Sequence, residues 1–133
     1  MKKVITILII GISTISLITG CENNQKEIEE EIKSNTNEGV IKDQKVDVFE
    51  LKKTSLVYEN GRTTLETTVT NTSDKVEYLK EFKIKILDKD GNEIKTLTGF
   101  IGGKIEAGES KVIHSYCKED LSNAASIEYK VLY

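Results

Sequence analysis

Several residue types that carry chemistry are rare or absent in this chain of 133 residues. It has no tryptophan, no proline, two cysteines and a single histidine, His114. A zinc site needs three or four ligands drawn from histidine, cysteine and carboxylates, and nucleophilic catalysis needs a nucleophile beside an oriented base. Because His114 is alone and the β-rich part has no dense pair of acidic residues, we expect no catalytic residue, no metal ligand and no cofactor.

Arginine is also scarce, since Arg62 is the only one among 19 basic residues, which face 22 acidic ones. A surface built on lysine is strongly hydrated and has few planar groups for bidentate recognition. An acidic balance argues against electrostatic binding to nucleic acid. We therefore expect no nucleic-acid partner.

The first 21 residues have the layout of an export signal. A basic start is followed by the apolar residues 4–18 and then by a short segment that ends at Cys21. A charged start, an apolar core and a small residue at the cut are typical of a secretory signal. The tetrapeptide Ile18–Cys21 resembles the lipobox of bacterial lipoproteins. The resemblance implies that residues 1–20 are removed, that Cys21 carries a diacylglyceryl group, and that the protein is anchored to the cell membrane on its extracytoplasmic face.

An uncleaved N-terminal anchor is the alternative. A spanning helix needs about 20 apolar residues, and the apolar run here is shorter and contains serine and threonine. Cleavage before Cys21 would remove Lys2 and Lys3 and leave 17 basic against 22 acidic residues, a net charge of −5. Lipidation of Cys21 would also leave Cys117 without a partner in the chain. We interpret Cys117 as a buried small hydrophobe, with an intermolecular disulfide or a reactive role as the alternatives.

The next segment is polar. Residues 22–45 contain only four aliphatic residues and many charges. A segment of this composition buries too little apolar surface to offset the entropy of ordering. We expect residues 21–45 to form a lipidated N-terminus and a flexible linker, and residues 46–133 to form the folded domain.

From Val46 onward the sequence alternates with a period of two. In residues 82–86 apolar side chains alternate with Lys83 and Lys85, which predicts a strand with its apolar face inward and its lysines outward. Asn60-Gly61 supplies the positive φ angles of a tight hairpin, and residues 88–92 and 106–109 are turns by composition. The expected strands cover residues 46–51, 55–58, 62–70, 76–87, 93–100, 111–117 and 126–133. About seven short strands without a long helical pattern predict an all-β fold, an antiparallel immunoglobulin-like β-sandwich.

From residue 69 onward the sequence resembles the FxLYD family, a bacterial extracytoplasmic domain often found in lipoproteins. The matching segments are residues 69–74, 84–88, 90–91 and 105–109. In the pattern that names the family, Ile84, Ile86 and Leu87 stand for Phe, Leu and Tyr, and Asp88 is kept. The usual proline before Gly108 is replaced by Ala107. The resemblance covers roughly half of the chain and implies a sandwich domain with no catalytic residues to transfer.

Two motifs have a chemical interpretation beside a structural one. The loop that begins at Asp88 is similar to the opening of a calcium loop, but an EF-hand needs glycine at position 6 and glutamate at position 12. Here Gly91 falls at position 4 and Gly99 at position 12, so a hairpin turn is favoured. His114 is close to Ser115 and Cys117 in sequence. Strand alternation places the latter two on the opposite face, so we expect no local catalytic pair.

Tyrosine is the residue type best suited to form a binding face here, because it combines contact area with a polar tip. The alternative is that these side chains are half-buried in a sandwich. The five tyrosines are Tyr58, Tyr78, Tyr116, Tyr129 and Tyr133.

These patterns favour a non-catalytic envelope lipoprotein that displays a sandwich to a protein or glycan partner. An enzyme or accessory subunit acting on an envelope substrate, and a coat protein without a dedicated ligand, are the alternatives. The sequence assigns no ligand-binding residue.

Overall fold

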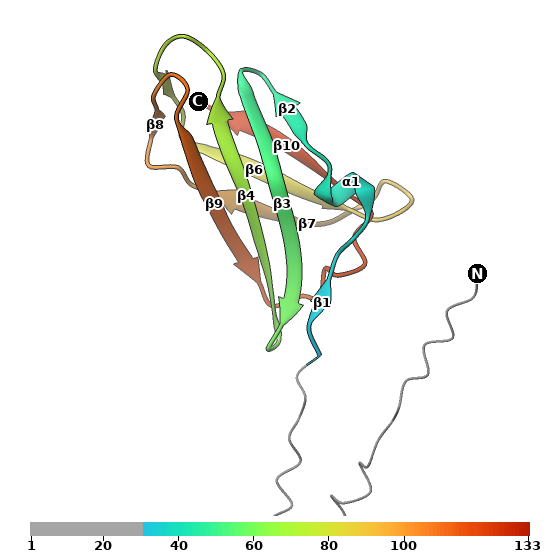
Figure 1. The fold of residues 1–133 in the computed structure, drawn as a ribbon. Coiled ribbons are helices and arrows are strands. Elements are labelled where there is room, and N and C mark those ends of the chain that lie inside the picture. The colour runs from blue at the N-terminus through green and yellow to red at the C-terminus, as the bar shows by residue number, and fades with distance from the viewer. Residues whose placement is uncertain (1–30) are drawn as a thin grey trace, which may run out of the picture.

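The computed structural model describes residues 31–133, and this part of the chain is built almost entirely from β-strands (Figure 1). The elements in chain order are β1 (Lys33–Ser34), α1 (Glu38–Ile41), β2 (Gln44–Val46), β3 (Phe49–Glu59), β4 (Arg62–Asn71), β5 (Glu77–Tyr78), β6 (Glu81–Leu87), β7 (Glu93–Gly99), β8 (Lys104–Ile105), β9 (Ser110–Cys117) and β10 (Ser126–Leu132).

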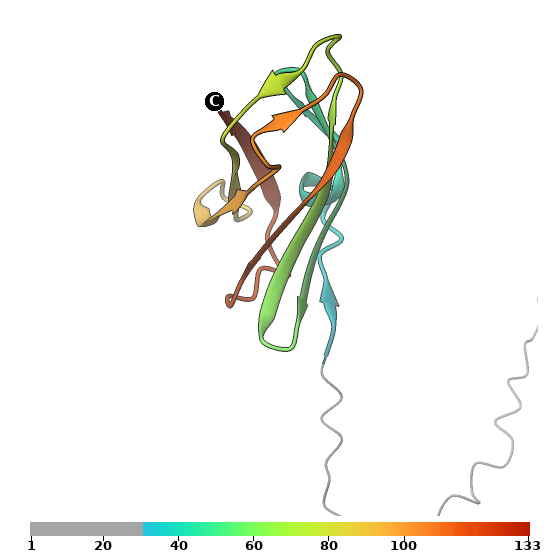
Figure 2. The same ribbon diagram turned by 90° about the vertical axis from the view of Figure 1, so that its left-hand side faces the viewer.

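The strands form two layers that face each other (Figure 2). In the first sheet the order is β1-β3-β4-β9, with β2 also paired to β3, and in the second the order is β10-β6-β7. A separate ribbon joins β5 to β8, and every pairing is antiparallel. The prediction of an all-β antiparallel sandwich is confirmed, while its immunoglobulin-like character stays a prediction.

Alternation along the strands builds the core. Leu65, Thr67 and Val69 of β4 face inward and are completely buried, as are Ile84 and Ile86 of β6. This is the facing that their alternation predicts, because successive side chains of a strand point to opposite faces.

Two aromatic rings join the layers. Phe49 of β3 meets Phe82 of β6 edge to face, with ring centroids 5.4 Å apart. Both side chains are completely buried. Edge-to-face contact is a favoured aromatic geometry, so this pair fixes one sheet against the other.

The expected turns form. Asn60 and Gly61 both have positive φ, 55° and 71°, as the tight β3–β4 hairpin requires. In the β6–β7 loop, Oδ1 of Asp88 accepts hydrogen bonds from the backbone N–H groups of Asp90 and Asn92, at 2.9 Å each. The Asp88 carboxylate therefore stabilises a turn, as the hairpin interpretation predicts.

Two predicted strand boundaries are wrong. The expected strand over residues 76–87 is interrupted between β5 and β6, because the N–H of Leu79 bonds to the carbonyl of Gly103 and that of Lys80 to Leu132. The two strands expected in residues 46–58 are instead the short β2 and the long β3. A tight turn at Asp47 and a bulge at Lys53, both with positive φ, set these limits.

The N-terminal boundary of the folded domain is also corrected. Residues 33–45 were expected to belong to a flexible linker, yet they contribute β1, α1 and β2, and Val40 is completely buried. The polar side chains of this segment bond to backbone carbonyls. Nδ2 of Asn35 donates to Leu121 and Ala124 at 3.2 and 2.8 Å, and Nε2 of Gln44 donates to Ile127 at 2.9 Å.

The polar composition of this segment predicted a linker because it contains little apolar surface to bury. The segment is ordered instead by hydrogen bonds to backbone carbonyls and by the burial of one valine, Val40. The domain therefore begins near Lys33, ahead of Val46. The expected signal peptide, Cys21 and the first part of the linker lie outside the described residues.

Candidate functional site

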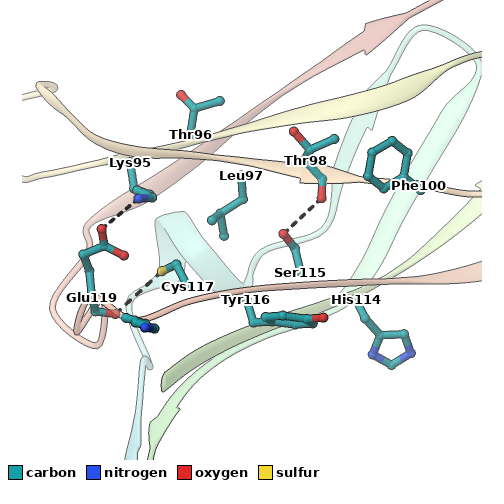
Figure 3. A pocket seen from close by; sticks show the side chains of 11 residues that line it. Lys95, Thr96, Leu97, Thr98, Phe100, His114, Ser115, Tyr116, Cys117 and Glu119 are labelled. Atoms are coloured by element: carbon teal, nitrogen blue, oxygen red, sulfur yellow. Dashed lines mark hydrogen bonds and ion pairs between the residues drawn. The ribbon is translucent and has the colours of Figure 1, made fainter. Parts of the chain in front are cut away.

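The described chain has a groove between β7 and β9, which are edge strands of opposite sheets. Its volume is about 610 Å³, within the range of roughly 300–1,000 Å³ typical of ligand sites. Figure 3 shows the two strands crossing the view, with side chains from each lining the space between them.

Specific contacts set the limits of the groove. At one end the strands approach so closely that a Cβ added to Gly99 would lie 2.4 Å from Cγ2 of Ile113. Next to it the hydroxyl of Ser115 donates to the carbonyl of Thr98 at 3.0 Å. At the other end Lys95 and Glu119 form an ion pair at 2.7 Å (Figure 3). The groove therefore lies between two contacts that join β7 to β9 and to the residues that follow β9.

The floor is apolar and the rim is aromatic. Leu97 is buried and Cys117 is half-buried against the core. Phe100 and Tyr116 keep 67% and 65% of their surfaces exposed. The guanidinium of Arg62 lies over the Tyr116 ring, 5.2 Å from its centroid, a cation–π arrangement. Such exposed aromatics beside a concave surface are typical of recognition sites.

Electrostatics at the groove follow from the Lys95–Glu119 pair. The hydrogen bond from Lys95 lowers the pKa of Glu119 to about 2, and the same contact raises the pKa of Lys95. Both side chains are therefore charged at neutral pH. Burial raises the pKa of the Cys117 thiol, so this thiol stays protonated and is a poor nucleophile.

His114 lines the groove together with Ser115 and Cys117 but is hydrogen-bonded to neither. Its ring is exposed on the outer face of β9, and Nδ1 lies 3.5 Å from Oε2 of Glu66 on the neighbouring strand. Ser115 is buried on the opposite face and bonds to Thr98. In Figure 3 the imidazole points away from the Ser115 hydroxyl and the Cys117 thiol. The alternation argument for His114 is confirmed.

The possible metal ligands and the tyrosines do not gather at one site. Within residues 31–133 no group of three or more histidine, cysteine or acidic side chains is placed to hold a metal ion. Of the five tyrosines, Tyr116 lines the groove, and Tyr129 is buried with its hydroxyl 3.4 Å from that of Thr54. The half-buried Tyr58 and the exposed Tyr78 and Tyr133 line neither of the described pockets. The tyrosines therefore do not form one shared binding face.

Sequence reasoning missed the groove as a site. Its lining residues come from two strands that are not neighbours in any sheet, and strand alternation says nothing about which edges of two layers come together. The available signal was two exposed aromatics, Tyr116 on β9 and Phe100 directly after β7.

None of the described helices has the length and apolar character that a bilayer crossing requires. No family model, curated protein or solved structure matches this chain.

Proposed function

We propose that this chain is a lipid-anchored, extracytoplasmic interaction module of the bacterial cell envelope, without catalytic activity. The observation that carries the docking role is the groove between β7 and β9, with exposed Phe100 and Tyr116 at its rim. The proposal of membrane attachment rests on the lipobox-like segment Ile18–Cys21. The assignment of residues 46–133 to the FxLYD family remains part of the proposal and rests on the turn motifs.

The non-catalytic character is supported by the chemistry of the groove. Its polar groups include an ion pair, a hydroxyl that bonds to a backbone carbonyl, a thiol whose pKa is raised, and His114, which is hydrogen-bonded to neither Ser115 nor Cys117. A nucleophile needs an adjacent base or a lowered pKa, and Ser115 and Cys117 have neither. The groove is better suited to binding than to bond cleavage.

Anchoring at Cys21 would hold the domain close to the membrane. Cys21 precedes Lys33, where the first strand begins, by twelve positions. Twelve residues span at most about 40 Å, so the groove would face partners in the layer next to the bilayer. Two acyl chains give a stable anchor where one is marginal.

A pair of cysteine variants tests the anchor. Cys21→Ser should move the protein from the membrane fraction to the aqueous phase in detergent partitioning and abolish incorporation of a labelled fatty acid. Cys117→Ser is the matched control, since it removes the other thiol and should leave both readouts unchanged. Retention of Cys21→Ser in the membrane fraction, at the level of the unmodified protein, would contradict the proposal.

A further inference from the structure

The two layers of the sandwich are unequal in width. The first sheet is four strands across, because β1 and β2 lie along the same edge of β3 and are followed by β4 and β9. The second sheet has three strands, β10, β6 and β7. Within residues 31–133 no strand pairs with the outer edge of β7. The groove lies beside this edge, so the position of a fourth strand in the second sheet coincides with the site.

The opposite edge of the same sheet is covered. Gln44 donates to the carbonyl of Ile127 in β10, and α1 lies against this strand with Val40 buried. A Cβ added to Gly39 would lie 2.4 Å from the carbonyl oxygen of Ala125, just before β10. Natural proteins cover or shorten sheet edges because unpaired backbone groups recruit other chains. The chain covers β10 in this way, whereas no described strand pairs with the outer edge of β7, which is bridged by side chains at Thr98 and Lys95.

The backbone of β7 is suited to pairing. The carbonyl of Thr98 points across the groove, where it accepts from Ser115. In an antiparallel strand the N–H and C=O of one residue share a side, and residues two positions apart share it too. Thr96 and Thr98 therefore both turn their backbone groups toward the groove. β7 has seven residues and no proline, and its one lysine, Lys95, is held in the ion pair with Glu119.

We propose that the β7 edge binds an extended polypeptide segment of a second envelope protein, apolar at alternate positions and carrying a carboxylate, which adds a fourth strand to the β10-β6-β7 sheet. This inference rests on the proposed function as an interaction module. Strand addition obtains affinity from main-chain hydrogen bonds and specificity from pockets for alternate side chains. Inward side chains of the segment would contact Leu97 and Cys117 on the groove floor.

The charge of the segment follows from the cations beside the groove. Glu119 is already paired with Lys95. Within the described residues neither Lys118 nor Arg62 has an ion pair, and both lie near Tyr116 at the same end of the groove. A carboxylate on the bound segment would complement them. A glycan could stack on Tyr116 and bond through its hydroxyls, but only an extended peptide repeats its donors and acceptors at the spacing of a strand edge, so the observations favour a peptide.

A displayed library of random twelve-residue peptides, selected on the full chain purified in detergent, tests the proposal. We expect enriched sequences with alternating apolar residues and an acidic residue. Binding of a synthetic selected peptide should slow hydrogen exchange at the amides of Thr96 and Thr98 and slow labelling of Cys117 by an uncharged thiol reagent. N-methylation of alternate peptide amides that face β7 should weaken binding at least tenfold, whereas methylation of the intervening amides should not.

Two variants of the chain locate the site. Lys118→Glu should weaken binding of the acidic peptide and strengthen binding of the same peptide with lysine in place of its acidic residue. Tyr116→Ala should weaken both peptides. Lys85→Glu, a charge change on the exposed outer face of β6, is the control and should alter neither affinity. Thermal unfolding followed by circular dichroism confirms that each variant is folded.

Four results would overturn the inference: failure to enrich any peptide, protection from exchange away from β7, insensitivity to N-methylation, or binding of a peptidoglycan-derived oligosaccharide in the groove without any peptide. Because binding is measured in detergent, these outcomes do not depend on whether Cys21→Ser leaves the membrane.

Discussion

At the scale of single residues, the buried polar side chains are the ones whose environment is best defined. Asn71 is completely buried at the end of β4, donates to the carbonyls of Lys75 and Ile105 at 2.8 and 3.0 Å, and accepts from the N–H of Ser73 at 2.9 Å. Within residues 31–133 every buried side-chain nitrogen and oxygen has a hydrogen-bond partner. Because an unpaired buried polar group is costly, these bonds restrict the loops to one conformation.

Neighbouring positions on β6 give a test of side-chain facing. Ile84→Ala should lower the free energy of unfolding by about 2–5 kcal/mol, because it removes buried methyl groups and leaves a cavity. Lys85→Ala, on the exposed face, should change it by less than about 0.5 kcal/mol. Urea unfolding followed by circular dichroism measures both. Equal effects at the two positions would contradict the observed facing of β6.

At the scale of elements, the short N-terminal segment is held by packing and hydrogen bonds more than by its own propensity. A four-residue helix such as α1 is unstable alone, and α1 forms because Val40 is buried and the amide side chains around it bond to carbonyls near β10. The segment therefore behaves as part of the sandwich.

Substitution of Gly39 by alanine tests whether α1 packs against the segment before β10. The test is whether the free energy of unfolding rises or falls. In an exposed helix Gly→Ala stabilises by about 0.5–1 kcal/mol. Here the new Cβ would lie 2.4 Å from a backbone carbonyl oxygen and 3.0 Å from Cβ of Ser126, so we expect Gly39→Ala to destabilise by about 1–3 kcal/mol.

Glu38→Ala, on the exposed first position of α1, is the control and should have an effect within about 0.5 kcal/mol. Thermal unfolding measures both variants. Stabilisation by Gly39→Ala would mean that α1 does not pack against the segment before β10.

At the scale of the whole molecule, the sandwich has one covered side and one open side. The N-terminal segment and β10 close the first, and the second contains the groove between β7 and β9. On the open side no described strand pairs with the outer edge of β7, which is why the interaction site is proposed there.

Limited proteolysis tests how far the folded unit extends. Lys42 follows α1 directly, and its N–H bonds to the carbonyl of Glu38 at 2.9 Å. Cleavage requires local unfolding of the backbone around the cut, so trypsin should cut after Lys42 slowly in the native chain and rapidly in urea. Mass spectrometry identifies the fragments. A native fragment that begins at Asp43 and forms at the rate seen in urea would show that the unit starts at Val46 after all.

The sequence by itself determined the all-β class, most of the longer strands and most of the turns. The alternation in residues 82–86 places Ile84 and Ile86 inward, and Asn60-Gly61 forms a hairpin, because these features depend on local backbone geometry alone. It also determined that His114 and Ser115 lie on opposite faces, since adjacent positions of a strand always do.

Only the tertiary structure decided the extent of the domain and the place of the groove. Residues 33–45 are ordered by carbonyls of residues 121–127, more than 80 positions away. The groove exists because β7 and β9, which belong to different sheets, come together at one side of the sandwich. Local propensity contains no information about contacts of this range, because they form only when the two layers pack on a shared core.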